Sequence, residues 1–352
     1  MKSKAVGRRP TTHASPPRAA VFLIGLLLTS TAAAHHSPAA FDRSQEVTLE
    51  GKLTRYAYNN PHTYLTLEIV RADGTTAKQQ VEAGPISNMQ PLGLMRDSLR
   101  VGERVVVRAN PSRRGAGYTV LGLDVTRADG KAFPLFVASA SARPASTAVA
   151  TSFAGVWRPT VASFMELNTA IPSWPLTAEG RHKLTDARSA NRTTQSECIP
   201  AGAPMLMVYP VVSTVTVDST EVVFDIDWLD AERVVHLDVA VHPADLELSL
   251  QGHSIGRWEG GALVVDTIGF APHEEGLGFG MASSERKHLV ERFTLDADRR
   301  HLLYDVTVED PAYLTQTVQF SARWEYSPHL SPSGVACDLE VARQYLQEEG
   351  RD

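Results

Sequence analysis

Apolar and polar residues alternate along the chain from Val47 onward, and this pattern predicts short β-strands. Two alternating segments flank the turn Ala72-Asp-Gly74. Asp-Gly at such a position is typical of an antiparallel hairpin with one buried face. Five strands and one short helix favour a small closed barrel of the OB type, and a sandwich is the alternative. The expected strands are 47–54, 63–70, 75–81, 104–109 and 118–126, and the short helix is expected within 88–94.

The second half of the chain also alternates between strand-like segments and turns. An amphipathic segment at 177–188 is the best helix candidate there, and 338–348 is expected to form a short final helix. So many strands exclude a layered α/β fold and favour an antiparallel, lipocalin-like barrel that can hold a small ligand. The expected strands are 211–217, 221–228, 233–239, 246–251, 254–258, 262–267, 288–295, 302–309 and 315–326.

A linker separates the two halves. Residues 138–152 are small and nearly uncharged, so they lack the large apolar side chains that a core needs. A chain of 352 residues also exceeds the size at which one core usually stops growing. The sequence therefore predicts an all-β protein with a small barrel domain at 35–137 and a larger barrel domain at 153–352.

The first 34 residues have the layout of a signal peptide. Basic residues precede a short apolar stretch, 19–28, which ends in the small-residue run Thr29-Ser-Thr-Ala-Ala-Ala34. The stretch is shorter than the roughly 20 residues that span a bilayer. Cleavage after Ala34 or Ala33 is expected, and an uncleaved anchor is the alternative. We therefore expect a periplasmic or secreted protein with no stable membrane span after cleavage.

Removal of the signal peptide makes the protein more acidic. Residues 1–34 carry five Lys and Arg residues and no acid, so the net charge changes from -6 to -11. Nucleic acids and anionic membranes require clustered basic residues, which disfavours both as partners. A small-molecule ligand or substrate is the expected partner. The two cysteines, Cys198 and Cys337, are expected to form a disulfide in an exported protein, with two buried thiols as the alternative.

Two resemblances to protein families follow from short motifs. Ala34-His-His-Ser37, Phe41-Asp-Arg43 and Asn60-Pro-His62 resemble the start of an exported family of small β-domains of unknown function. Gly252-His-Ser-Ile-Gly-Arg-Trp-Glu-Gly260 is similar to a motif of uncharacterised secreted bacterial proteins, together with 263–267 and 308–311. Neither resemblance implies an established activity.

Three histidines are candidates for a copper site. If cleavage follows Ala34, the α-amine and imidazole of His35 can chelate one ion, and His62 can supply a third nitrogen. Such an all-nitrogen set suits Cu(II) and resembles the histidine brace of some exported copper proteins. If cleavage follows Ala33, His36 becomes the third residue, and that tripeptide binds Cu(II) or Ni(II) without any fold. The alternative is a solvated terminus and a turn histidine with no metal.

The second half contains the candidate catalytic residues. His253, Arg257 and Glu259 share one side of a predicted strand, and His288 and Glu291 lie on a later strand. Converging in a barrel mouth, these groups can perform acid–base chemistry or bind a carboxylate or a phenol. The structural alternative has glycine turns around the strand and Arg257 paired with an acid such as Asp266 or Glu309.

Three functions are consistent with these patterns. The first is a periplasmic binding protein for a small apolar or aromatic ligand, with copper as its only expected cofactor. The second is an enzyme, a lyase, isomerase or hydrolase, that acts inside the second barrel. The third is an envelope scaffold, which a filled barrel would favour.

Overall fold

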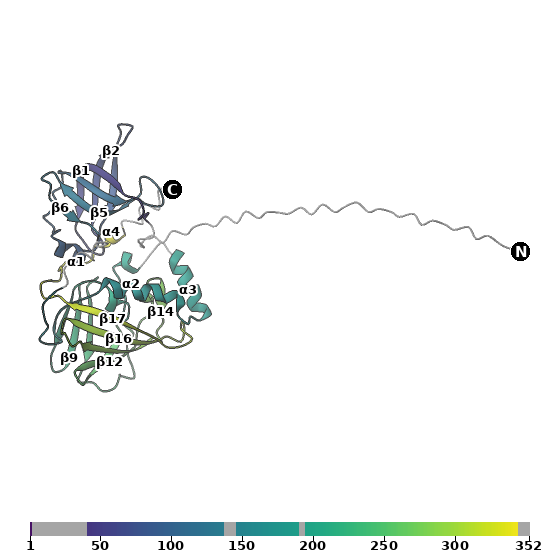
Figure 1. Cartoon of the computed structure of the whole chain (residues 1–352). Helices are drawn as coiled ribbons and strands as arrows, with labels where there is room; N and C mark the ends of the chain where they lie inside the picture. Colours follow the sequence, from purple (N-terminus) through teal and green to yellow (C-terminus); the bar gives the residue numbers. More distant parts are fainter. Residues whose placement is uncertain (2–40, 137–145, 190–193, 344–352) are drawn as a thin grey trace. The chain divides into compact units, whose positions relative to one another are not determined.

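The computed structural model describes residues 1, 41–136, 146–189 and 194–343, and most of these residues lie in or between β-strands (Figure 1). The strands form two barrels, so the expected all-β fold is confirmed. The predicted signal peptide and part of the predicted linker lie outside the described residues, and the domain boundaries remain predictions. No described helix is long and apolar enough to cross a membrane.

The small barrel has the strand order β3-β2-β1-β4-β5-β6, and a parallel pairing of β3 with β5 closes it. A short helix lies between β3 and β4, as in an OB-type barrel. Strand β1 of this barrel pairs with both β2 and β4. It lies so close to β2 that a Cβ atom at Gly51 would be 2.6 Å from the Glu68 carbonyl oxygen. The elements are β1 (Val47–Ala57), β2 (Tyr64–Val70), β3 (Thr76–Glu82), α1 (Ile86–Met89), η2 (Gln90–Leu92), β4 (Arg104–Asn110), β5 (Val120–Arg127) and β6 (Ala132–Pro134).

The large barrel is a closed ring of nine strands in sequence order, β7 to β12 followed by β15 to β17. The strands are β7 (Gly155–Pro159), β8 (Ser213–Val217), β9 (Glu221–Ile226), β10 (Ala231–His236), β11 (His253–Glu259), β12 (Ala262–Ile268), β15 (His288–Leu295), β16 (His301–Glu309) and β17 (Val318–Tyr326). A separate hairpin, β13 (His273–Gly278) and β14 (Met281–Ser283), connects β12 to β15.

An odd number of strands cannot alternate in direction all the way around a closed ring, so one neighbouring pair must be parallel. That pair is β10 and β11, which share only two residue pairs. Parallel neighbours require a long crossover connection. Residues 237–252 supply this connection, so the expected strand 246–251 is wrong: only Ser249 makes an isolated bridge there, with Phe270.

Short helices flank the strands of the large barrel. The expected helix at 177–188 is confirmed as α3 (Ala178–Ser189), whereas α2 (Val161–Ala170) was not predicted. Thr160 caps α2 by accepting a hydrogen bond from the Ser163 amide at 3.1 Å. The remaining helices are η4 (Ile171–Ser173), η5 (Thr194–Glu197), η6 (Leu206–Val208) and α4 (Leu339–Ala342).

A disulfide joins Cys198, just after η5, to Cys337, just before α4, and confirms the expected pairing. The bond closes a loop that contains nearly the whole large barrel. In the chain-entropy model such a long loop contributes about 4 to 5 kcal/mol to stability. Disulfides of this kind are typical of proteins in oxidising compartments.

Aromatic side chains fill much of the interior of the large barrel. The ring centroids of Phe224 and Phe293 lie 5.2 Å apart, and those of Phe293 and Tyr304 lie 4.8 Å apart. Trp157 and Trp324 are fully buried in the same core. These contacts make the interior a packed core over this region, in contrast to an open lipocalin-like cavity.

A layer of polar side chains crosses the same interior. The Arg233 guanidinium donates to Glu291 Oε1 at 2.8 Å and to its second carboxylate oxygen, and both side chains have no exposed surface. Thr267 Oγ1 accepts from Arg233 at 2.9 Å, and the Tyr304 hydroxyl donates to Glu291 at 2.8 Å. Burial lowers the pKa of Arg233, but the Glu291 carboxylate more than offsets this and raises it. The pair is therefore charged and hydrogen-bonded inside the barrel.

A buried lysine precedes β15. Lys287 Nζ donates to the carbonyl oxygens of Ala203, at 2.7 Å, and Gly276, at 3.3 Å, and lies 3.9 Å from the centroid of the Phe270 ring. Burial lowers the pKa of Lys287 from 10.5 to about 7. The amine therefore changes its charge near neutral pH without leaving the core.

We predict that Glu291→Gln destabilises the protein by about 3 to 5 kcal/mol, because it leaves the Arg233 guanidinium buried without its counter-charge. Urea denaturation of the wild type and the variant measures this loss. The double variant Arg233→Met/Glu291→Leu is the control and should recover most of the stability, since no charge remains in the core. A loss below about 1 kcal/mol in Glu291→Gln would contradict a charged pair.

We also predict that Lys287 makes stability depend on pH above neutrality. Between about pH 7 and 10.5 the unfolded chain holds a proton on this lysine and the folded protein does not, so stability rises with pH. The free energy of unfolding of the wild type, relative to Lys287→Met, should rise by on the order of 3 kcal/mol from pH 7 to 9.5. A difference that stays constant over this range would contradict the lowered pKa.

Candidate functional site

Ionisable side chains line the outer face of five neighbouring strands of the large barrel. Side chains alternate between the two faces of a strand, and the residues adjacent to these ionisable ones, such as Val235, Ser254 and Leu289, are buried inside. We call the outward-facing residues the outer array. They are His236 on β10, His253 on β11, Asp266 on β12, His288 on β15 and Glu309 on β16.

The crossover connection brings a further histidine onto the outer array. His242 Nε2 lies 2.9 Å from Asp266 Oδ1, and His242 Nδ1 lies 2.8 Å from His253 Nδ1. A carboxylate only accepts hydrogen bonds, so His242 carries its proton on Nε2 and accepts through Nδ1. His253 must then donate from Nδ1, which makes its Nε2 a hydrogen-bond acceptor. We call Asp266, His242 and His253 the imidazole relay.

Neighbouring groups hold the relay in place. The second oxygen of Asp266 lies 3.1 Å from His288 Nε2, and His288 Nδ1 lies 3.6 Å from a Glu309 oxygen. The ring of His236 stacks on that of His253, with the centroids 5.2 Å apart. The Asp266 carboxylate therefore orients the imidazoles of His242 and His288, and the ring of His236 covers one side of His253.

The electrostatics of the relay favour a neutral imidazole beside a charged carboxylate. Burial lowers the pKa of His253, and the nearby His242 and His236 lower it further. Burial raises the pKa of Asp266, but the hydrogen bonds from His242 and His288 outweigh this and lower it. At neutral pH His253 is thus a neutral base and Asp266 is ionised.

A cleft of about 440 Å³ adjoins the relay where β10 and β11 meet in parallel. His236 and His253 line it together with residues of the crossover connection. Asp230 and Glu232 give it negative charge, and the described residues that line it include no Lys or Arg. Its apolar wall comes from Pro200, Ala231, Val234 and Leu250. The cleft can therefore accept a partly apolar molecule that carries a hydrogen-bond donor or a positive charge.

The structure brings two of the five candidate catalytic residues, His253 and His288, into the outer array. Arg257 and Glu259 lie on the same outer face of β11, but they are exposed and pair with each other at 2.7 Å. Arg257 therefore pairs with an acid on its own strand. The sequence had suggested an acid such as Asp266 or Glu309, on another strand, as its partner. Glu291 faces the opposite way, into the interior, where Arg233 binds it.

The candidate copper ligands are only partly described. His35 and His36 lie outside the described residues. His62 follows the cis Asn60-Pro61 bond, and its Nδ1 lies 2.7 Å from Glu82 Oε1. Both side chains are mostly buried. A carboxylate in this position fixes the orientation of the imidazole ring.

Sequence reasoning missed His236 and His242 as site residues and gave Asp266 only a structural role. His236 lies three residues after Arg233 on β10 and therefore on the opposite face of the strand. Its outward direction could have been predicted once Arg233 was known to point inward. His242 lies outside any strand, in the crossover connection. No periodic pattern places such a residue, so only its proximity in space reveals it.

Comparison with known proteins gives a match for the N-terminal part of the chain. A search of curated proteins and a search of solved structures found no match. A family model matches residues 25–121, a segment that contains the His-His and Asn-Pro-His motifs and most of the small barrel. The resemblance expected for this part is thereby confirmed: residues 25–121 match the Family of unknown function (DUF6152).

Proposed function

We propose that this protein is an exported, periplasmic or secreted binding protein that holds a small ligand in the cleft beside the imidazole relay. The observation that carries the proposal is the position of His253 in the lining of the cleft. Burial and the nearby His242 and His236 lower its pKa and keep it neutral, and the hydrogen bond with His242, which Asp266 orients in turn, fixes its ring. A neutral imidazole nitrogen fixed in this way accepts one hydrogen bond from a ligand in a defined direction.

The lining of the cleft defines the class of ligand. Carboxylates and the imidazole acceptor favour a hydrogen-bond donor or a cation, and they disfavour the carboxylate ligands that the sequence also allowed. The apolar wall favours a hydrophobic or aromatic body. A small aromatic amine combines these features, so we propose this chemical class as the ligand.

The relay also supports the enzyme alternative. A carboxylate and an imidazole that orient a second imidazole can make His253 Nε2 a general base for a bound substrate. Such an enzyme would act at the outer cleft, because packed aromatic rings and the Arg233–Glu291 pair occupy much of the interior. Binding requires fewer assumptions, since it needs only the cleft and the oriented acceptor, whereas catalysis also needs a group that reacts with the substrate.

We predict saturable binding of benzylamine and tryptamine, and much weaker binding of benzoate, which the negative lining repels. His253→Gln should weaken amine binding about tenfold, the loss expected from one hydrogen bond. Binding should also weaken as pH falls through the lowered pKa of His253, because the protonated imidazole no longer accepts and repels a cation. Isothermal titration calorimetry at several pH values measures all three effects.

The matched control is His329→Gln, which changes an exposed histidine outside the array. This variant should bind the amines as the wild type does. Equal affinity in His253→Gln and His329→Gln, or tighter binding of benzoate than of amines, would overturn the proposal. Chemical conversion of a bound amine would instead favour the enzyme alternative.

A second candidate function, copper binding by the small barrel, is favoured by the contact between His62 and Glu82. Histidines that ligate metals almost always place their other ring nitrogen against a carboxylate, a backbone carbonyl or water, and His62 Nδ1 has such a partner in Glu82. We propose that His35, His62 and the free amine left by cleavage after Ala34 bind one Cu(II) ion.

We predict that the cleaved protein binds one equivalent of Cu(II) and that His62→Ala abolishes this binding. Glu82→Gln should weaken it about 10- to 100-fold, because the ring loses its orienting carboxylate. Electron paramagnetic resonance during a copper titration measures both changes, with His329→Ala as the control. Copper binding that survives His62→Ala unchanged would place the metal on the N-terminal peptide alone.

A further inference from the structure

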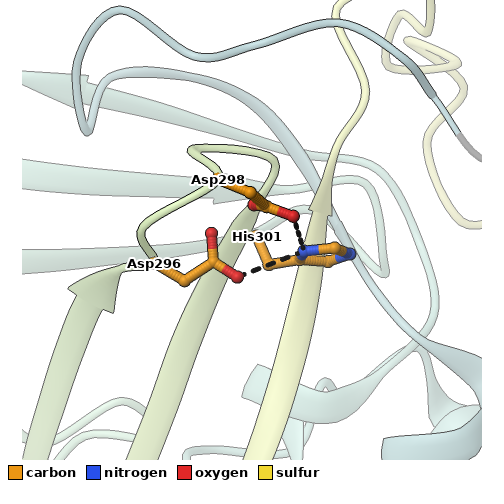
Figure 2. Close-up of side chains that lie close together, drawn as sticks. All are labelled: Asp296, Asp298 and His301. Carbon is orange, nitrogen blue, oxygen red and sulfur yellow. Dashed lines mark ion pairs between the residues drawn. The ribbon is translucent and has the colours of Figure 1, made fainter.

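Two carboxylates and one imidazole converge in the turn between β15 and β16, away from the outer array. One oxygen of Asp296 lies 3.3 Å from His301 Nδ1, and one oxygen of Asp298 lies 3.4 Å from the same nitrogen. All three ligand atoms lie within 4.8 Å of one another. Figure 2 shows the carboxyl groups of Asp296 and Asp298 both directed toward the same ring nitrogen of His301. We propose that Asp296, Asp298 and His301 bind a divalent first-row transition-metal ion, and that Zn²⁺ fits them best.

The distances favour shared metal ligation over direct hydrogen bonds. Most N–H···O hydrogen bonds span about 2.7 to 3.2 Å, and both N···O separations here are longer than is typical. Zinc binds imidazole nitrogen at about 2.0 to 2.1 Å and carboxylate oxygen at about 2.0 to 2.2 Å, in tetrahedral geometry. Two adjacent ligands of such an ion therefore lie about 3.3 to 3.5 Å apart. The separations in this turn match the spacing of ligands around one ion.

The hydrogen bonding of the turn is a second and independent observation. His301 Nδ1 is screened from solvent and makes no hydrogen bond in the described part of the chain, although both aspartates form ion pairs with it. The same holds for Asp296 Oδ1, the oxygen of that carboxyl group that does not face His301. Buried polar atoms without a partner cost free energy, and most proteins avoid them. A metal ion bound between the two carboxylates and the imidazole would accept the lone pair of His301 Nδ1 and would balance the charge of both carboxylates.

The charge of the turn also favours a cation. Asp296 and Asp298 place two carboxyl groups beside one imidazole, and Asp298 Oδ1 also accepts a hydrogen bond from the Arg300 amide at 2.7 Å. The nearby Arg299 does not neutralise the pair, because its guanidinium donates to the carbonyl oxygens of Ala150 and Thr151. The ion pairs described for both aspartates end on His301.

The hairpin holds the three ligands in place before any ion binds. The Asp296 amide donates to the His301 carbonyl oxygen at 3.0 Å, and the Arg299 amide donates to the Asp296 carbonyl oxygen at 3.0 Å. Arg299 takes a left-handed backbone conformation, with φ of 56°, which closes the turn. Little chain entropy is therefore lost on binding.

The donor set also selects the kind of metal. Imidazole suits zinc, copper, nickel and iron, whereas magnesium and calcium prefer oxygen ligands alone. Three protein ligands leave the fourth tetrahedral position of zinc for water or another small ligand. Because this site lies in the β15–β16 turn, it is independent of the proposed cleft ligand and of the proposed copper site.

The test compares metal binding by the purified full chain and by two ligand variants, Asp298→Asn and His301→Gln. Bound zinc is counted by mass spectrometry under native conditions, and Co²⁺ is used as a probe because tetrahedral Co²⁺ absorbs strongly in the visible range. The wild type should bind one more equivalent of Zn²⁺ than either variant. Its Co²⁺ complex should show the tetrahedral spectrum, and both variants should lose it.

The matched control is Asp218→Asn. Asp218 likewise accepts hydrogen bonds from backbone amides in a hairpin turn, at 2.7 Å from Thr220, but no ion pair with a histidine is described for it. This variant should keep the wild-type stoichiometry and spectrum. Circular dichroism verifies the fold, and Asp298→Asn, which alters a half-exposed side chain, serves as the test if His301→Gln does not fold. Equal zinc stoichiometry in the wild type and Asp298→Asn would overturn the proposal.

Discussion

The closure of nine strands into one ring is the constraint on which the large barrel and its candidate site depend. An odd ring requires one parallel pair, and a parallel pair requires a long connection. The connection 237–252 carries His242 and forms part of the cleft wall. The place where the sheet is joined by the fewest residue pairs is therefore also the place where a cleft and a histidine relay meet.

Strand alternation then separates two sets of charged groups that share the same five strands. Inside the barrel, Arg233 and Glu291 neutralise each other away from solvent, and the hydroxyl groups of Thr267 on β12 and Tyr304 on β16 complete their hydrogen bonds. Outside, Asp266 orients the imidazoles of His242 and His288 next to solvent. The inner groups stabilise the fold and the outer groups can meet a ligand, although Thr267 and Asp266 are neighbours in sequence.

Much of the fold could be predicted from the sequence, because alternation and turn residues mark each strand locally. The hairpin around Asp73-Gly74 was predicted in this way. The helix α3 was predicted from an amphipathic pattern, and the disulfide from the pair of cysteines in an exported protein. The segment 246–251 was wrongly predicted as a strand, because an alternating pattern does not show whether a partner strand is beside it. Ring closure decides that point, and closure is a property of the whole barrel.

The site was less predictable than the fold. The alternation of side chains along a strand placed His253, Arg257 and Glu259 on one face. It did not show that this is the outer face of the barrel, nor that Glu291 on another strand points inward. That assignment required the interior ion pair with Arg233. Asp296 and Asp298 lie in a turn and show no periodic signal, and their approach to His301, the first residue of β16, depends on the backbone of one hairpin.

The protonation of the imidazole relay is the most direct test of this account. Long-range ¹H–¹⁵N correlation spectra of protein labelled with ¹⁵N-histidine report which ring nitrogen carries the proton. At pH 7.5 we expect His242 to carry a proton on Nε2, facing Asp266, and His253 to be a neutral ring protonated on Nδ1. A His253 ring protonated on Nε2, or on both nitrogens, would contradict the relay and remove the acceptor that the cleft presents to its ligand.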